Sequence, residues 1–290
     1  METVRSTRRR IDEHDVVVGG IRLHVREVGA IHAPPVVFLH GIMGHRRDWD
    51  VLIDRVGERH SVVAVDQRGH GRSEWTRSYR LDDMADDAIA LIEHLQVAPV
   101  PIVGHSMGAM VTLLVAARRP DLVDRIVLID IVPESLATDF GAHMPAMFDA
   151  MAAASYASID DAVAEWQAGN VLARTDLLRN YVAHALVTGA DGRCRWGFDA
   201  VGLRSFAAGV SPDELRAAAD TVACSTLLVR GEHSPLTTPD QMCAFARRFT
   251  DVRTVVVRDG GHDLGVEQPE AVADAVLKFL TPAHDGESTR

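Results

Sequence analysis

Lysine is almost absent from this chain of 290 residues, because 29 of its 30 basic side chains are arginine and Lys278 is its one lysine. Lys278 lies in the apolar pattern AVLKFL near the C-terminus, which predicts a helix. Phosphate-binding P-loops, the lysine pair of protein kinases and the Schiff base of pyridoxal enzymes all need a lysine in another setting. The composition therefore excludes these three chemistries, and we expect no cofactor.

Cysteine, positive charge and long apolar runs are also scarce. The three cysteines lie far apart without C-x-x-C spacing, so neither a disulfide framework nor a zinc site is predicted. The histidines form no H-E-x-x-H motif, and no metal site is expected. A formal net charge of −11 argues against nucleic acid as a partner.

Membrane and export signals are missing as well. The longest apolar run, around Ala109–Ala117, is about half a membrane span, so no membrane association is expected. The basic start METVRSTRRRID has no apolar stretch after it, so we expect no signal peptide and a cytoplasmic location.

Strand-like apolar runs alternate with helical patterns, which predicts an α/β fold with a doubly wound, mostly parallel sheet. Strands are expected at His14–Val18, Ile21–Val28, Val36–Leu39, Ser61–Val65, Val100–Val103, Arg125–Ile129, Thr226–Val229 and Arg253–Val257. Helices are expected at Asp48–Val56, Leu81–Leu95, Met107–Arg118, Pro239–Phe249 and Pro269–Leu280. Between Glu134 and Thr221 no convincing strand occurs, which predicts an inserted helical segment. The expected division is a core of residues 14–133 and 222–282, an insertion of 134–221, and tails of 1–13 and 283–290.

The sequence Gly104-His105-Ser106-Met107-Gly108 has the pattern G-x-S-x-G between a predicted strand and a predicted helix. Such a turn projects the serine hydroxyl above the sheet. Neighbouring backbone crowds the turn, so the positions two before and two after the serine need glycine. The helix beginning at Met107 would direct its N-terminal amides toward a developing oxyanion.

With this motif the chain resembles the α/β-hydrolase family, over residues 14–280. The segment HGIMG at 40–44 is similar to the family's oxyanion loop, DQRGHGRS at 66–73 to the loop after its fourth strand, and Gly260-Gly261-His262 to its histidine loop. The resemblance implies that Ser106 is the nucleophile and His262 the general base. It also implies that the backbone N–H groups of Ile42 and Met107 form the oxyanion hole.

The acid of the triad departs from the usual family pattern. After the strand that follows the insertion, Ser234 stands where most members have aspartate. Asp130 ends the preceding apolar run, and a buried carboxylate there needs a partner. The run I-D-I-x-P around Asp130, with S-P at the usual acid position, resembles a bacterial esterase subgroup. We therefore predict Asp130 as the acid, with Glu232 as the alternative.

The resemblance implies that the inserted segment 134–221 is a lid, because it occupies the family's usual lid position. Its methionines and aromatic residues suggest a mainly apolar small-molecule substrate. Met144, Phe148, Trp166 and Trp196 are the predicted substrate contacts. The predicted function is hydrolysis of a carboxylic ester, lactone or thioester through an acyl-enzyme. Cofactor-free haloperoxidase or perhydrolase activity and carbon–carbon bond hydrolysis use the same triad and stay open. Two functions of another class also stay open, namely a non-catalytic ligand receptor and a lyase or cyclase that has repurposed the triad. The sequence leaves the oligomeric state open.

Overall fold

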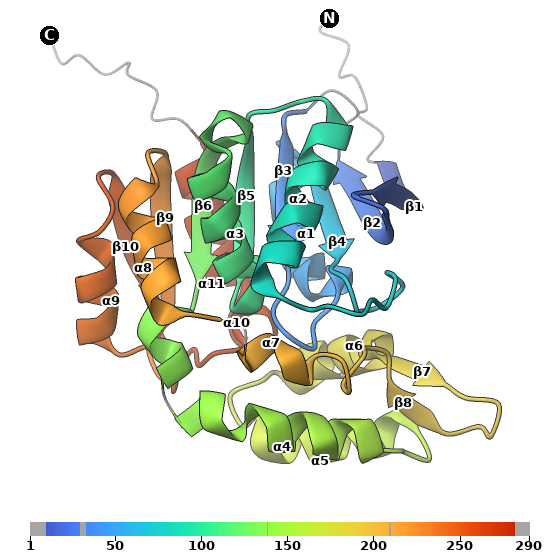
Figure 1. Cartoon of the computed structure of the whole chain (residues 1–290). Coiled ribbons are helices and arrows are strands. Elements are labelled where there is room, and N and C mark those ends of the chain that lie inside the picture. The colour runs from blue at the N-terminus through green and yellow to red at the C-terminus, as the bar shows by residue number, and fades with distance from the viewer. Residues whose placement is uncertain (1–9, 30–32, 138, 209, 282–290) are drawn as a thin grey trace, which may run out of the picture.

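A computed structural model describes residues 10–29, 33–137, 139–208 and 210–281, and within them the fold is built on an eight-stranded sheet (Figure 1). Its strands are β1 (Arg10–Val18), β2 (Ile21–Gly29), β3 (Pro35–Leu39), β4 (Ser61–Asp66), β5 (Val100–His105), β6 (Val123–Ile129), β9 (Ser225–Gly231) and β10 (Val252–Val257). The spatial order is β1-β2-β4-β3-β5-β6-β9-β10. Only the β1–β2 and β2–β4 pairs of this sheet are antiparallel, so the sheet is mostly parallel, as predicted.

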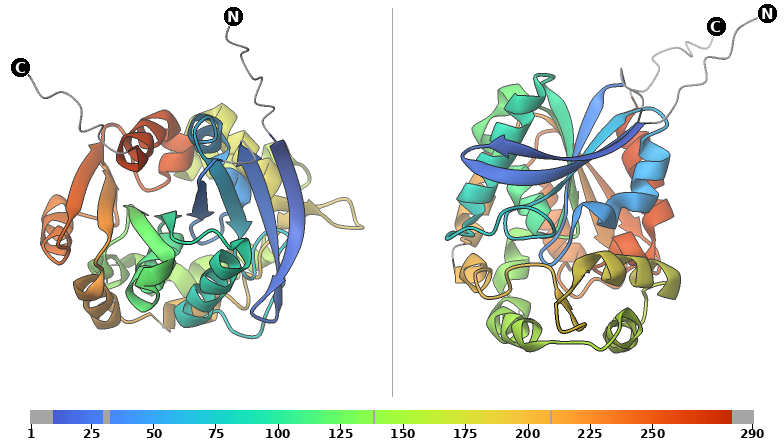
Figure 2. Two further views of the ribbon diagram at one scale, coloured as in Figure 1. Left: turned by 90° about the horizontal axis from the view of Figure 1, so that it is seen from above. Right: turned by 90° about the vertical axis from the view of Figure 1, so that its right-hand side faces the viewer.

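Helices cover both faces of the sheet, which gives the doubly wound arrangement (Figure 2). The core helices are α1 (Asp50–Val56), α2 (Leu81–Leu95), α3 (Met107–Arg118), α8 (Pro212–Thr221), α9 (Pro239–Ala246), α10 (Leu264–Glu267) and α11 (Pro269–Leu280). Helices α1 and α11 pack together on one face, while α2, α3 and α8 pack on the other. Two buried clusters, one on each face, form the core.

The central strands are apolar on both faces because helices cover both. In β3, the residues Val36, Val37 and Phe38 are fully buried, which explains their continuous apolar run. Helix α3 is apolar on nearly every side, since ten of its twelve residues are buried. Helix α3 is therefore packed firmly beside β5, and this packing holds the turn between β5 and α3 in place.

The lid lies over the carboxyl ends of the parallel strands (Figure 1). It contains α4 (Asp139–Ala153), α5 (Ile159–Gly169), α6 (Thr175–Ala185) and α7 (Arg204–Ala208), and the 3-10 turn η3 (Pro133–Ala137) leads into it. A small hairpin, β7 (Leu186–Thr188) with β8 (Cys194–Trp196), also belongs to it. The expectation of no strand in this segment was wrong, because strands of three residues show no readable period.

Other boundaries differ from those expected. Strand β1 begins at Arg10, so residues 10–13 belong to the sheet and not to a tail. Helix α8 falls within 134–221 but packs against α3 with Leu215 and Ala219 buried, so it belongs to the core layers. The first predicted helix begins as a 3-10 turn, η1 (Arg46–Trp49). The described helices include none long and apolar enough to cross a membrane.

Candidate active site

Ser106 occupies a strained turn between β5 and α3. Its φ is 51° and its ψ is −115°, a backbone conformation that residues other than glycine rarely adopt. A Cβ on Gly104 would lie 2.3 Å from the carbonyl oxygen of Gly108, and one on Gly108 would lie 2.1 Å from that of Leu39. The two glycines are therefore needed for clearance, and the turn holds the Ser106 side chain at the sheet edge beneath the lid.

Three side chains from separate parts of the chain form one hydrogen-bonded line at this edge. The Ser106 hydroxyl lies 3.1 Å from His262 Nε2. On the other side of the ring, His262 Nδ1 lies 2.7 Å from Asp130 Oδ2. Because a carboxylate only accepts, Nδ1 carries the proton and Nε2 is free to accept from the serine. The three residues predicted as a triad are thus in contact in the required order.

Asp130 is held where β6 ends, with its side chain fully buried. Its Oδ1 accepts a hydrogen bond from the backbone N–H of Gly231 at 3.1 Å. Its Oδ2 accepts the Ser234 hydroxyl at 2.6 Å as well as His262. Ser234, which stands where most members of the resembled family have aspartate, thus donates a hydrogen bond to the predicted acid.

Glu232, the alternative acid, lies elsewhere. Its side chain is 46% exposed and accepts the backbone N–H of Asp259 at 3.1 Å. Asp130 is buried and bonded to His262, so the geometry favours Asp130 over Glu232.

The loop that carries His262 is held by hydrogen bonds on both sides. The Gly261 N–H donates to Glu267 Oε2 at 2.5 Å. His105, the second residue of the G-x-S-x-G motif, is hydrogen-bonded through Nε2 to the His262 carbonyl oxygen at 2.9 Å. The two histidine rings are also in contact, with centroids 4.8 Å apart.

The electrostatics prepare the His262 ring to accept a proton. Burial acts to lower the pKa of His262, but the hydrogen bond and charge of Asp130 outweigh it, and the pKa is raised from 6.5. The charges of Asp263 and Glu267 act in the same direction. Burial, followed by the charge of His262, lowers the pKa of His105, so His105 stays neutral.

The predicted oxyanion loop passes next to Ser106. A Cβ on Gly41 would lie 3.3 Å from the Ser106 Cβ, so the backbone leading to Ile42 runs beside the hydroxyl. The loop is anchored at Met43, whose N–H donates to His70 Nε2 at 3.2 Å. From the lid, the Tyr181 hydroxyl donates to the Met43 carbonyl at 3.0 Å.

A second lid contact holds His45, two residues after Met43. The Nε2–H of His45 donates to the backbone carbonyl of Tyr181 at 3.0 Å. The two rings are stacked with centroids 5.2 Å apart. Helix α6 of the lid is therefore fastened directly to the oxyanion loop.

A cleft lies between this loop, the His262 loop and the lid, with about 490 Å³ of empty space when the solvent at its mouth is included. It is lined by Ile42, Met43, Asp48, His105, Trp166, Asn170, Leu178, Tyr181, Asp263, Gly265 and Val266. Of the four predicted substrate contacts, Trp166 lines it. Met144, Phe148 and Trp196 are buried in the core instead, where Trp196 packs on Trp166 with ring centroids 4.7 Å apart.

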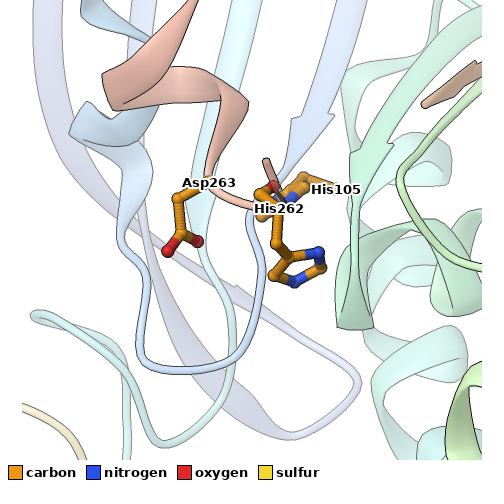
Figure 3. A group of neighbouring side chains, drawn as sticks. All are labelled: His105, His262 and Asp263. Atoms are coloured by element: carbon orange, nitrogen blue, oxygen red, sulfur yellow. Dashed lines mark hydrogen bonds between the residues drawn. The ribbon is translucent and has the colours of Figure 1, made fainter. Parts of the chain in front are cut away.

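Among the described residues, two groups have metal-ligand spacing. His105, His262 and Asp263 each offer one atom within 4.8 Å of the others (Figure 3). Both ring nitrogens of His262 are already hydrogen-bonded, one to Asp130 and the other to Ser106, so neither is free to bind a metal ion. The second group, Glu232, His233 and Asp259, is exposed.

Sequence reasoning missed several side chains of this region. His105 was within the motif, and its burial beside the serine could have been inferred from the crowded turn. Tyr181 gave no local signal, because its position depends on how the lid folds over the sheet. Asp263 was set aside as the acid because it is too close to His262 in the chain to orient the ring, and its place in the cavity wall depends on how the His262 loop folds.

Comparison with known proteins agrees with this fold. The sequence profile of the alpha/beta hydrolase fold matches residues 34–269. The chain is 32% identical over 280 residues to a 2-(acetamidomethylene)succinate hydrolase of Mesorhizobium japonicum, covering 94% of each chain. It is 30% identical to lipase LipV of Mycobacterium tuberculosis, covering 90% of this chain and 99% of the lipase. The solved structure of an E-2-(acetamidomethylene)succinate hydrolase superposes with a TM-score of 0.84 at 30% identity, covering 93% of this chain and 99% of that one. The chain therefore belongs to the α/β-hydrolase fold family and is a hydrolase.

Proposed function

We propose that the chain is a serine hydrolase that cleaves carboxylic esters of mainly apolar small molecules, with lactones and thioesters as related substrates. The observation that carries the proposal is the continuous line of contacts from the Ser106 hydroxyl through His262 to Asp130. This arrangement is the one that activates a serine for attack on a carbonyl carbon.

In the proposed reaction, the Ser106 oxygen attacks the carbonyl carbon while His262 Nε2 takes its proton. Asp130 holds the ring in the tautomer that allows this and balances the positive charge that develops on it. The backbone N–H groups of Ile42 and Met107 hold the oxyanion, and the N-terminal end of α3 adds a favourable dipole.

His262 then returns the proton to the departing alcohol, and the acyl group remains on Ser106. Water enters, gives its proton to His262 and attacks the acyl carbon. The tetrahedral intermediate formed in this step collapses to release the acid, and His262 returns the proton to the Ser106 oxygen.

The test is labelling with a fluorophosphonate probe together with a panel of p-nitrophenyl esters, lactones and acyl thioesters. We expect stoichiometric labelling of the wild-type protein and none of Ser106→Ala. Labelling that survives Ser106→Ala, or no labelling and no turnover, would contradict the mechanism. The panel also includes 2-(acetamidomethylene)succinate, because the similarity to that hydrolase extends over nearly the whole chain. Acetate with peroxide tests for perhydrolysis.

A further inference from the structure

The cavity under the lid is lined in part by Ile42 of the predicted oxyanion loop and by His105, the chain neighbour of Ser106, and its wall holds acidic residues. Its lining includes two carboxylates, Asp48 and Asp263, and no arginine or lysine among the described residues, although the chain has 30 basic side chains. A substrate carboxylate buried here would find no positively charged partner, and a buried unpaired charge is costly.

The two carboxylates differ in how far their charge is already compensated. Asp48 Oδ2 accepts the backbone N–H of His45 at 3.0 Å, and Asp48 Oδ1 lies 2.8 Å from His45 Nδ1. Burial acts to lower the pKa of His45, but the charge and hydrogen bond of Asp48 outweigh it and the pKa is raised, which favours the protonated ring that pairs with Asp48. Asp263 has no side-chain hydrogen bond or ion pair within the part of the chain that the structure describes, and it makes no capping bond at the start of α10. Figure 3 shows its side chain extending from the loop beside the His262 ring. Asp263 is therefore the group whose charge acts on the cavity.

The remaining polar groups of the cavity are neutral. Burial, together with the charges of Asp48 and Asp263, raises the pKa of Tyr181 well above 10, so the phenol keeps its proton. His105 is neutral because burial lowers its pKa. Trp166 and Tyr181 pack with ring centroids 5.8 Å apart and offer aromatic surface, which accepts apolar and cationic groups.

We infer that the substrate group held in this cavity is uncharged or cationic, and that Asp263 selects against carboxylate-bearing substrates. The inference rests on the proposed ester hydrolysis. A like charge about 6 Å from Asp263 in a half-solvated cavity should lower kcat/KM by about tenfold.

Two matched ester series test this, one for each side of the scissile bond. The acyl series is p-nitrophenyl valerate, the p-nitrophenyl monoester of glutaric acid and the p-nitrophenyl ester of 4-trimethylammoniobutyrate. The alcohol series is 3,3-dimethylbutyl acetate, 4-acetoxybutyrate and acetylcholine, followed by acid release. In at least one series we expect the carboxylate member to have about tenfold lower kcat/KM than the neutral member.

The variant Asp263→Asn removes the charge and should bring the anionic-to-neutral ratio of kcat/KM in that series close to one. The ratio is the readout because Asp263 also raises the pKa of His262, an effect shared by every ester. Asp240→Asn, on the exposed start of α9, is the matched control and should leave the ratio as in the wild type.

The outcomes separate the two proposals. A wild-type enzyme that hydrolyses the carboxylate members as fast as the neutral ones in both series overturns this inference and leaves ester hydrolysis intact. So does a ratio that Asp263→Asn leaves unchanged. No turnover of any ester and no fluorophosphonate labelling would overturn the proposed function, and this inference with it.

Discussion

Replacing Asp130 by asparagine tests the acid of the proposed triad. Three donors converge on this carboxylate: the Gly231 N–H on Oδ1, and the Ser234 hydroxyl and His262 Nδ1–H on Oδ2. Asparagine has one acceptor oxygen. If that oxygen keeps the Gly231 contact, its NH₂ group faces His262 Nδ1, and the ring must move its proton to Nε2.

A proton on Nε2 would face the Ser106 hydroxyl, and His262 could then no longer act as the base. We expect kcat/KM for p-nitrophenyl valerate to fall by about 10³–10⁴-fold, which corresponds to about 4–5 kcal/mol of transition-state stabilisation. Steady-state kinetics give the loss, and thermal unfolding shows whether the variant remains folded.

Glu232→Gln is the matched control. It removes one carboxylate near the site whose side chain is half-exposed and bonded to the Asp259 backbone. We expect less than about a threefold change, as for other exposed positions. A folded Asp130→Asn enzyme within tenfold of the wild type, or a larger loss in Glu232→Gln, would refute the assignment of the acid.

Three further predictions follow from the same geometry. Because the base must be neutral and the pKa of His262 is raised, kcat/KM should rise with pH through an apparent pKa above 6.5, and a midpoint below that value would contradict the electrostatics. Ser234→Ala removes a hydrogen-bond donor to Asp130. We expect about three- to tenfold lower kcat/KM and a higher apparent pKa of His262 in the pH profile, and a lower apparent pKa would argue against the contact. Gly108→Ala would place a Cβ 2.1 Å from the Leu39 carbonyl, and urea unfolding should show about 2–3 kcal/mol lower stability, whereas an unchanged midpoint would contradict this close approach.

Much of the core could be read from local patterns. The helices Leu81–Leu95, Met107–Arg118 and Pro269–Leu280 have the predicted bounds, because their apolar spacing and their flanking residues coincide. The contact between Asp130 and His262 was also foreseeable, since a carboxylate at the end of a buried strand needs a partner at the same sheet edge.

The lid was harder to read, because amphipathic patterns give a helix but not the surface it covers. Helix α8 has an apolar face like a lid helix, and only the tertiary structure shows that this face packs on α3. For the same reason, Met144 and Phe148 could not be distinguished from Trp166 as cavity residues. All three are apolar residues of lid helices, and burial separates them.

The fastening of the lid to the oxyanion loop has a consequence for substrate entry. Tyr181 both lines the cavity and holds the Met43 carbonyl and the His45 ring. If α6 swung away to admit substrate, the backbone beside Ile42 would lose these supports at the same time. An open enzyme would then be a poor catalyst, and hydrolysis would begin only after the cover had returned. Access and reactivity would thus alternate within each turnover.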